Sequence, residues 1–135
     1  MLRVVVDTNL WISFLIGRKL AILTDLFKRS DIQILSSSEQ PAELSDVSTR
    51  FNFRKYFTEV QADELVNLLY ASAEFVDIRE RVRACRDEND DFLLDIAVNG
   101  RADIFITGDN DLLVLNPFRV IDIVIYIDFE NRYSG

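Results

Sequence analysis

The sequence predicts an α/β fold, namely a three-layer α/β/α domain with a mostly parallel central sheet. Short runs that are apolar on both faces, as in buried parallel strands, alternate along the chain with longer segments of helical periodicity. Glycines and prolines are few, and no repeat or low-complexity tract interrupts this alternation. A length of 135 residues is enough for one substantial core, so we expect a single domain over residues 1–135.

The first part of the chain supplies two of the expected strands and the first helices. In order, we expect a strand at 2–6, helices at 10–16 and 19–28, and a strand at 32–35. Gly17 separates the two helices. A run of three serines with Pro41 close behind then marks the start of another helix, because serine and proline favour the first positions of a helix.

The second part continues the same alternation. Thr58 and Gln61 have the spacing of a capping box, which predicts that a helix begins there. A third strand is expected at 74–78, a helix from 89–91 up to Gly100, and further strands at 104–107 and 120–127.

Composition excludes several kinds of chemistry. The chain has no histidine, which excludes Ser-His-Asp and Cys-His catalysis and any zinc site that needs histidine. The one cysteine, Cys85, excludes an internal disulfide and a thiolate zinc site, and it suits a reducing cytoplasm. No apolar run approaches the roughly 20 residues of a membrane span, so we expect no membrane association. With 23 acids against 15 bases, carboxylate chemistry with hard divalent cations remains.

Two aspartates follow buried strands. Asp7 ends the run at 2–6, and Asp109 follows the run at 104–107. In an open parallel sheet, the ligand crevice lies beyond the carboxyl ends of the strands, so both acids are candidate site residues. Strand-end aspartates also serve as loop formers and helix N-caps, and for either one alone this second interpretation has equal weight.

Helical wheels select further acids. In the helix after Pro41, Glu43 lies beside the apolar stripe, which consists of Leu44, Val47 and Phe51. Asp46 and Glu39 lie farther round, so Glu43 is the inward candidate, although a partly solvated glutamate is equally compatible with the pattern.

In the helix that begins at 89–91, Asp90 falls at the edge of the apolar face. Asp91 lies almost opposite that face and Asp95 well away from it, so both are expected to be solvated. The first turn of a helix is the least certain part of a wheel, so Asp91 remains a substitute for Asp90.

Four segments in order resemble the PIN domain, the metal-dependent ribonuclease fold of bacterial and archaeal toxins of the VapC type. These segments are VVDTN, PAELSDV, CRDENDDFLLDIAVNGRAD and FITGDNDLL. The similarity extends over nearly the whole chain and is closest to the toxin components of PIN-type toxin–antitoxin systems. Any one segment is weakly diagnostic, whereas four in the correct order are specific.

The resemblance implies a set of site residues and partners. By motif position, the catalytic and metal-binding acids are Asp7, Glu43, Asp90 and Asp109, with Asp111 as a possible fifth metal ligand, and the residues that shape the substrate pocket are Thr8, Asn9 and Thr107. The implied cofactor is Mg²⁺ or Mn²⁺. The implied partners are an RNA substrate, an antitoxin protein and a second copy in a homodimer.

The expected mechanism is hydrolysis of RNA. One or two metal ions held by the carboxylates would lower the pKa of a bound water, which attacks the phosphodiester and leaves a 5′-phosphate. Arg83, Arg86 and Arg101 are candidate phosphate contacts, although solvated arginines are the commoner case.

Two other functions fit parts of the sequence. TGDND is similar to the metal-binding loop of aspartate-nucleophile phosphatases, but that family has a second aspartate where this chain has Asn9. A degenerate PIN module that binds RNA or protein without cleavage is the non-enzymatic alternative, and four retained acids argue against it.

Overall fold

The computed structural model describes residues 1–49, 55–83 and 88–133, except for the side chains of Leu20, Leu23 and residues 88–91. The strands are β1 (Leu2–Val6), β2 (Ile32–Ser36), β3 (Glu74–Phe75), β4 (Ile104–Ile106) and β5 (Asp122–Val124). The helices are α1 (Thr8–Ile16), α2 (Leu20–Lys28), α3 (Glu39–Ser48), α4 (Glu59–Ser72), α5 (Glu88–Asn99), α6 (Asn110–Leu113) and α7 (Tyr126–Tyr133).

The strands form one sheet in the order β3-β2-β1-β4-β5, and every pair is parallel. The predicted α/β class with a parallel sheet is therefore confirmed. Val6 is paired with Ile106, so β1 and β4 reach their carboxyl ends side by side. Because the first residue after each of these strands leaves the sheet at the same edge, their following loops are neighbours.

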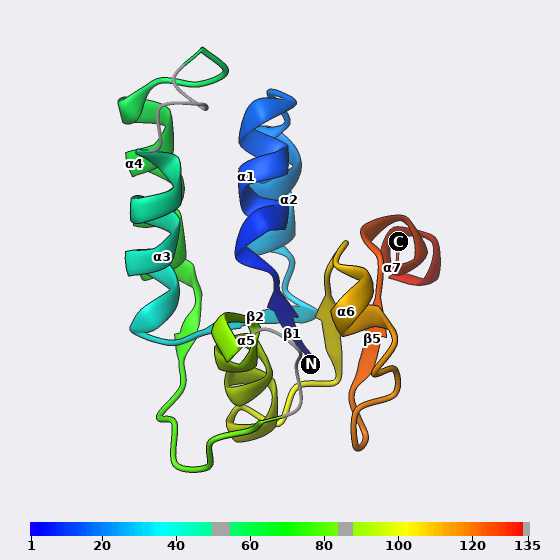
Figure 1. Cartoon of the computed structure of the whole chain (residues 1–135). Coiled ribbons are helices and arrows are strands. Elements are labelled where there is room, and N and C mark those ends of the chain that lie inside the picture. The colour runs from blue at the N-terminus through cyan, green and yellow to red at the C-terminus, as the bar shows by residue number, and fades with distance from the viewer. Residues whose placement is uncertain (50–54, 84–87, 134–135) are drawn as a thin grey trace.

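Side chains on the two faces of the sheet belong to two separate cores. Val4 and Val6 pack in a cluster with residues of α1, α2, α3 and α4 and with Phe129 of α7. Val5 and Leu35 face the other way, into a cluster with α5 and with Leu112 of α6. This alternation along each strand produces the expected three layers, with α1–α4 extending from one side of the sheet and α5 on the other (Figure 1).

Local signals explain where several helices begin and end. Thr58 and Gln61 form the predicted capping box at the start of α4, with the side chain of each accepting a hydrogen bond from the backbone N–H of the other. Gly100 follows α5 as expected, and a Cβ there would lie only 2.8–2.9 Å from Ile96 O and from side-chain atoms of Leu35 and Val76. Glycine at this position lets the end of the helix approach the sheet closely.

Two predicted strands are wrong in extent. The strand expected at 74–78 contains only the two residues of β3, and the run at 120–127 divides into β5 and the start of α7. A continuous apolar run carries no periodicity that would distinguish a strand from a buried helical turn. In the run at 120–127, β5 ends at Val124 and α7 begins at Tyr126, where the helix buries Phe129 in the first core.

The short helix α6 follows Asp109 and is absent from the elements expected from the sequence. Within the described ranges, no helix combines the length and apolar character that crossing a lipid bilayer requires.

Candidate active site

Asp7 leaves the sheet at the carboxyl end of β1 and caps α1. Its Oδ1 accepts a hydrogen bond of 2.9 Å from the backbone N–H of Asn9, and its Oδ2 accepts one of 2.6 Å from the Thr107 hydroxyl. Only 4% of Asp7 is exposed to solvent. An N-cap role alone does not require such burial, because capping aspartates are commonly solvated at helix ends.

Thr107 joins the ends of the two central strands. It is fully buried directly after β4, where its hydroxyl donates to Asp7 and accepts a hydrogen bond of 3.1 Å from the Asp109 N–H. Asp109 in turn caps α6 through a hydrogen bond of 2.9 Å from the Asp111 N–H to its Oδ1. One hydroxyl group thus fixes the relative positions of two acidic segments that are 100 residues apart in sequence.

Asp7 and Asp109 line the same cleft, which has a volume of about 290 Å³. The other lining residues are Asn9, Leu10, Ser13 and Gly108. Asp109 is partly exposed, and a Cβ at Gly108 would meet no atom within 4 Å, so this side of the cleft is open. An anionic group on the substrate would be repelled here unless a cation were also bound.

The electrostatics of the cleft also favour a bound cation. Burial raises the pKa of the Asp7 carboxyl, the hydrogen bonds from Thr107 and Asn9 oppose that rise, and the nearby charge of Asp109 adds to it. A buried carboxylate beside a second acid is costly without a counter-charge, and a divalent cation would supply one.

A buried glutamine links the remaining strand end to this site. Gln40 is fully buried, and its Nε2 donates to Val6 O at 2.7 Å and to the Thr8 hydroxyl at 3.4 Å. Its Oε1 accepts a hydrogen bond of 2.7 Å from the Ser36 hydroxyl. Gln40 therefore fixes the start of α3 against the carboxyl ends of β1 and β2. The role of Gln40 was not predicted from the sequence, because it stands in a polar stretch and no local pattern indicates that it is buried.

The model of the PIN domain family matches residues 3–111, which include β1 through the first residues of α6. The chain belongs to the PIN domain family. No curated protein matches the sequence significantly. PIN domains are in general nucleases that use divalent metals, so a nuclease-like role is supported by the family, and the cleft at Asp7 and Asp109 occupies the edge of the sheet where a ligand is expected.

The other expected acids of the PIN domain lie in different environments. Glu43 is half-buried on α3 with its Oε2 inside the protein, whereas Asp46 and Glu39 are exposed, in the order given by the helical wheel. Asp111 is exposed. Asp90 lies in the first turn of α5, but its side chain and that of Asp91 are outside the described part of the structure.

Three pocket-shaping positions also differ in exposure. Asn9 lines the cleft, whereas Thr8 and Thr107 are fully buried, so their hydroxyls contact protein groups rather than the cleft surface. Of the arginines expected as phosphate contacts, Arg83 and Arg101 are exposed, and Arg86 lies outside the described residues.

The expectation that Asp95 is solvated is wrong. Asp95 is only 3% exposed, because the segment before α5 packs along the flank of the helix that the wheel assigned to solvent. The backbone N–H of Val82 and the guanidinium of Arg81 both donate to its carboxylate, the latter at 3.1 Å. Asp95 is a structural acid that fixes this segment.

The carboxylate oxygens of the cleft fit a hard cation that takes its remaining ligands from water and substrate. Among the described side chains, no three carboxylates lie close enough together to hold a metal ion by themselves. Asp7 and Asp109 contribute oxygen atoms only, and Mg²⁺ commonly binds through one or two carboxylates together with waters and substrate phosphates. The cleft therefore suits an ion of that kind.

Proposed function

We propose that this PIN domain is a metal-dependent endoribonuclease that cleaves RNA phosphodiester bonds. The observation that carries the proposal is the pairing of a buried Asp7 with Asp109 in one cleft, at the carboxyl ends of adjacent parallel strands. Histidine is absent from the chain, so proton transfer or nucleophile activation by that residue has no basis here.

Asp7 and Asp109 would hold Mg²⁺ or Mn²⁺, with Glu43 and Asp90 as further ligands from α3 and α5 and Asp111 as a possible fifth. When bound, such an ion supplies an activated water and positive charge for the phosphate in the transition state. The protein contributes a rigid carboxylate, since Thr107 and Asn9 hold both oxygens of Asp7 in place. Hydrolysis by water breaks the bond to the 3′-oxygen, leaving a 3′-hydroxyl and a 5′-phosphate.

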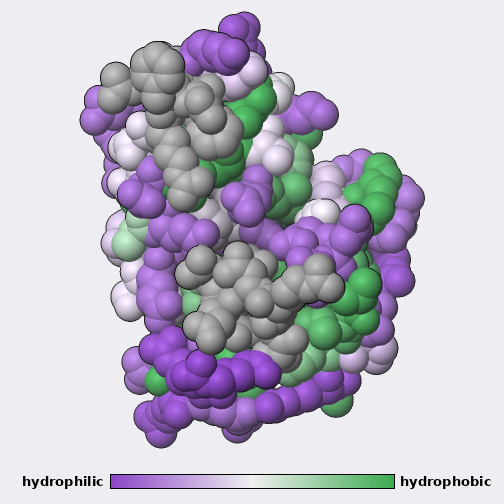
Figure 2. All heavy atoms as spheres, in the orientation of Figure 1, coloured by the Kyte–Doolittle hydropathy of each residue, from purple (hydrophilic) through white to green (hydrophobic). Residues whose placement is uncertain are grey.

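A toxin role with an antitoxin partner, and assembly as a homodimer in the cytoplasm, complete the proposal. Their main support is the similarity of the four sequence segments to PIN-type toxins. Exposed apolar side chains add to it: Val120 is 90% exposed and Val114 is 77% exposed. Figure 2 shows hydrophobic side chains gathered on the side of α6, β5 and α7. Apolar surface of this kind favours protein association. Light scattering and co-purification from the native host would test it, and a strict monomer without a partner would contradict it.

The test of the nuclease function uses a labelled single-stranded RNA with Mn²⁺, with and without excess EDTA. We expect cleavage that EDTA abolishes, and a loss of several orders of magnitude in Asp7→Asn and Asp109→Asn. Asp25→Asn, which removes one exposed acid from α2, is the matched control and should cleave normally. Undiminished cleavage in EDTA, or normal activity of Asp7→Asn, would overturn the mechanism.

The same assay distinguishes the two neighbouring acids of α5. We expect Asp90→Asn to lose activity like Asp7→Asn, and Asp91→Asn to retain it. An inactive Asp91→Asn beside an active Asp90→Asn would show that the predicted phase of the first turn of α5 is wrong by one residue.

A further inference from the structure

Arginines are concentrated in the connection between β3 and α5. We call residues 76–83 the arginine strap, because Arg79, Arg81 and Arg83 lie within five consecutive positions of a chain whose net charge is −8. All three side chains are exposed. A local concentration of guanidinium groups on an acidic protein defines a surface that is electrostatically different from its surroundings.

The arginine strap follows α5 toward the acidic edge of the sheet. Asn99, the last residue of α5, accepts the backbone N–H groups of Arg79 and Glu80 at 2.9 Å, and Asp95, one turn earlier, accepts the N–H of Val82. Because α5 connects two parallel strands, its first turn lies at their carboxyl ends. The strap therefore runs from the end of α5 up toward the turn that carries Asp90.

Other contacts hold the strap in place with its arginines outward. Val82 is buried in the second core, and the Glu80 carboxylate is paired with Arg119. The Arg81 Nη1 donates to Glu39 at 2.9 Å and to Asp95 at 3.1 Å, which bridges α3 and α5, yet the side chain remains 57% exposed. Glu80 is thus paired with Arg119 and Arg81 with two acids, so Arg79 and Arg83 are the arginines whose charge the strap presents on a fixed backbone.

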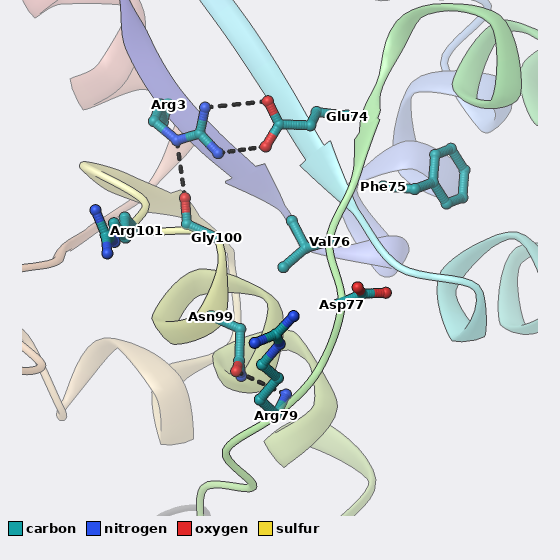
Figure 3. A pocket seen from close by; sticks show the side chains of 9 residues that line it. All are labelled: Arg3, Glu74, Phe75, Val76, Asp77, Arg79, Asn99, Gly100 and Arg101. Carbon is teal, nitrogen blue, oxygen red and sulfur yellow. Dashed lines mark hydrogen bonds and ion pairs between the residues drawn. The ribbon is translucent and has the colours of Figure 1, made fainter.

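The first residues of the strap, Val76, Asp77 and Arg79, form one wall of a pocket of about 570 Å³ (Figure 3). Arg3 and Glu74 pair with each other across it, and Arg3 also donates to Gly100 O at 2.8 Å. The Arg79 side chain extends from the strap beside that of Asn99 (Figure 3). In the part of the chain that the structure describes, the side chains of Arg79 and Arg101 make no ion pair, and Asp77 is the remaining exposed acid of the pocket lining. The balance of free charge in the pocket favours an anion.

We propose that the arginine strap binds the backbone of single-stranded RNA and directs it from this pocket toward the cleft at Asp7 and Asp109, an inference that rests on the proposed nuclease function. Planar guanidinium groups match phosphate oxygens, and they carry no preference for base sequence. The Cα atoms of Arg79 and Arg83 are at most about 14 Å apart, so the row is short enough for a few successive phosphates of one strand. A flexible single strand can follow such a row beside a helix, which a rigid duplex cannot do equally well.

The experiment measures RNA binding in the full-length Asp7→Asn protein, which is expected to be unable to cleave. A short fluorescein-labelled oligouridylate is titrated by fluorescence anisotropy at several salt concentrations. The test variant adds Arg79→Gln and Arg83→Gln together, and the control adds Arg18→Gln and Arg132→Gln, which remove the same charge from exposed positions at the end of α1 and in α7. Arg81 is left intact because it also anchors Asp95.

We expect the strap variant to bind roughly tenfold more weakly near physiological salt, and its plot of log affinity against log salt to be shallower by about 1.4, or about 0.7 per lost phosphate contact on a single strand. The control should change the affinity by less than about twofold, since its arginines lie off the proposed path. Both variants should keep the melting temperature of the Asp7→Asn parent, because the replaced side chains are exposed.

Three results would overturn the inference. Equal effects of the strap variant and the control would show that only overall charge matters, and a duplex of the same length that binds as tightly as the single strand would exclude the proposed selectivity. If the wild-type protein cleaves RNA and the strap variant still binds RNA normally, the proposed role of the strap is refuted, whereas the nuclease function is not. A wild-type protein that neither cleaves nor binds RNA would remove the nuclease function itself.

Discussion

Replacing Thr107 with valine tests whether one buried hydroxyl organises the acidic cleft. Valine keeps the branched shape of threonine but removes the hydrogen bond donated to Asp7 and the one accepted from the Asp109 N–H. Thr107→Ser is the matched control, since it keeps both hydrogen bonds and loses only a methyl group. A difference between the two variants therefore reports the hydroxyl and not the packing.

The expected loss follows from the two hydrogen bonds. A hydrogen bond to a charged group contributes about 1.5–3 kcal/mol and a neutral one about 0.5–1.5 kcal/mol, so Thr107→Val should lower the free energy of unfolding by about 2–4 kcal/mol at neutral pH. At about 4 °C for each kcal/mol in a chain of this size, the melting temperature should fall by about 8–16 °C.

The loss should also depend on pH, with a definite sign. Burial raises the pKa of the Asp7 carboxyl and the Thr107 hydrogen bond lowers it, so the valine variant should raise that pKa further. A raised pKa means that the folded state binds the proton more tightly than the unfolded chain does. The stability associated with this proton is complete at low pH and is lost as the pH rises through the folded-state pKa. The difference between wild type and Thr107→Val should therefore be larger at neutral pH than at acidic pH.

Urea unfolding in EDTA provides the assay. Trp11, the single tryptophan, is fully buried and reports unfolding by its fluorescence. Curves for wild type, Thr107→Val and Thr107→Ser at neutral and mildly acidic pH give the three free energies. If Thr107→Val is as stable as wild type, or if the serine variant loses as much as the valine variant, the hydroxyl does not organise the cleft.

Three further outcomes are expected. Gly100→Ala should lower the free energy of unfolding by about 1–3 kcal/mol, because its Cβ would lie within 3 Å of the helix backbone and the core. Gly108→Ala is the control and should not lower it, because a Cβ there meets nothing within 4 Å. Equal urea unfolding curves for the two variants would contradict this prediction. Asp95→Ala should cost about 2–3 kcal/mol by leaving the Val82 N–H buried without its acceptor, which urea unfolding and hydrogen exchange of that amide would show. Mn²⁺ at about a hundred times its dissociation constant should stabilise the wild type by about 2.7 kcal/mol and Asp109→Asn much less, and melting curves that ignore Mn²⁺ would count against a metal site.

The sequence by itself determined the fold class and the region of the candidate site. The apolar runs at 2–6 and 104–107 predict buried parallel strands, so Asp7 and Asp109, which follow them, are expected at the carboxyl edge of the sheet. The structure adds that these two strands are direct neighbours. The absence of histidine likewise limits the chemistry of the chain, whatever fold it adopts. These features are local or compositional, and they do not depend on which surface another segment covers.

Only the tertiary structure decided which polar groups are buried and what each one contacts. A helical wheel places Asp95 on the solvent side of α5. In the structure Asp95 is buried, because the arginine strap, a segment outside the helix, covers that flank. Gln40 is buried for the same kind of reason, since the ends of β1 and β2 converge on the start of α3. Periodicity within one segment indicates which face of a helix packs on the core, but it does not show which remote segment covers the other faces.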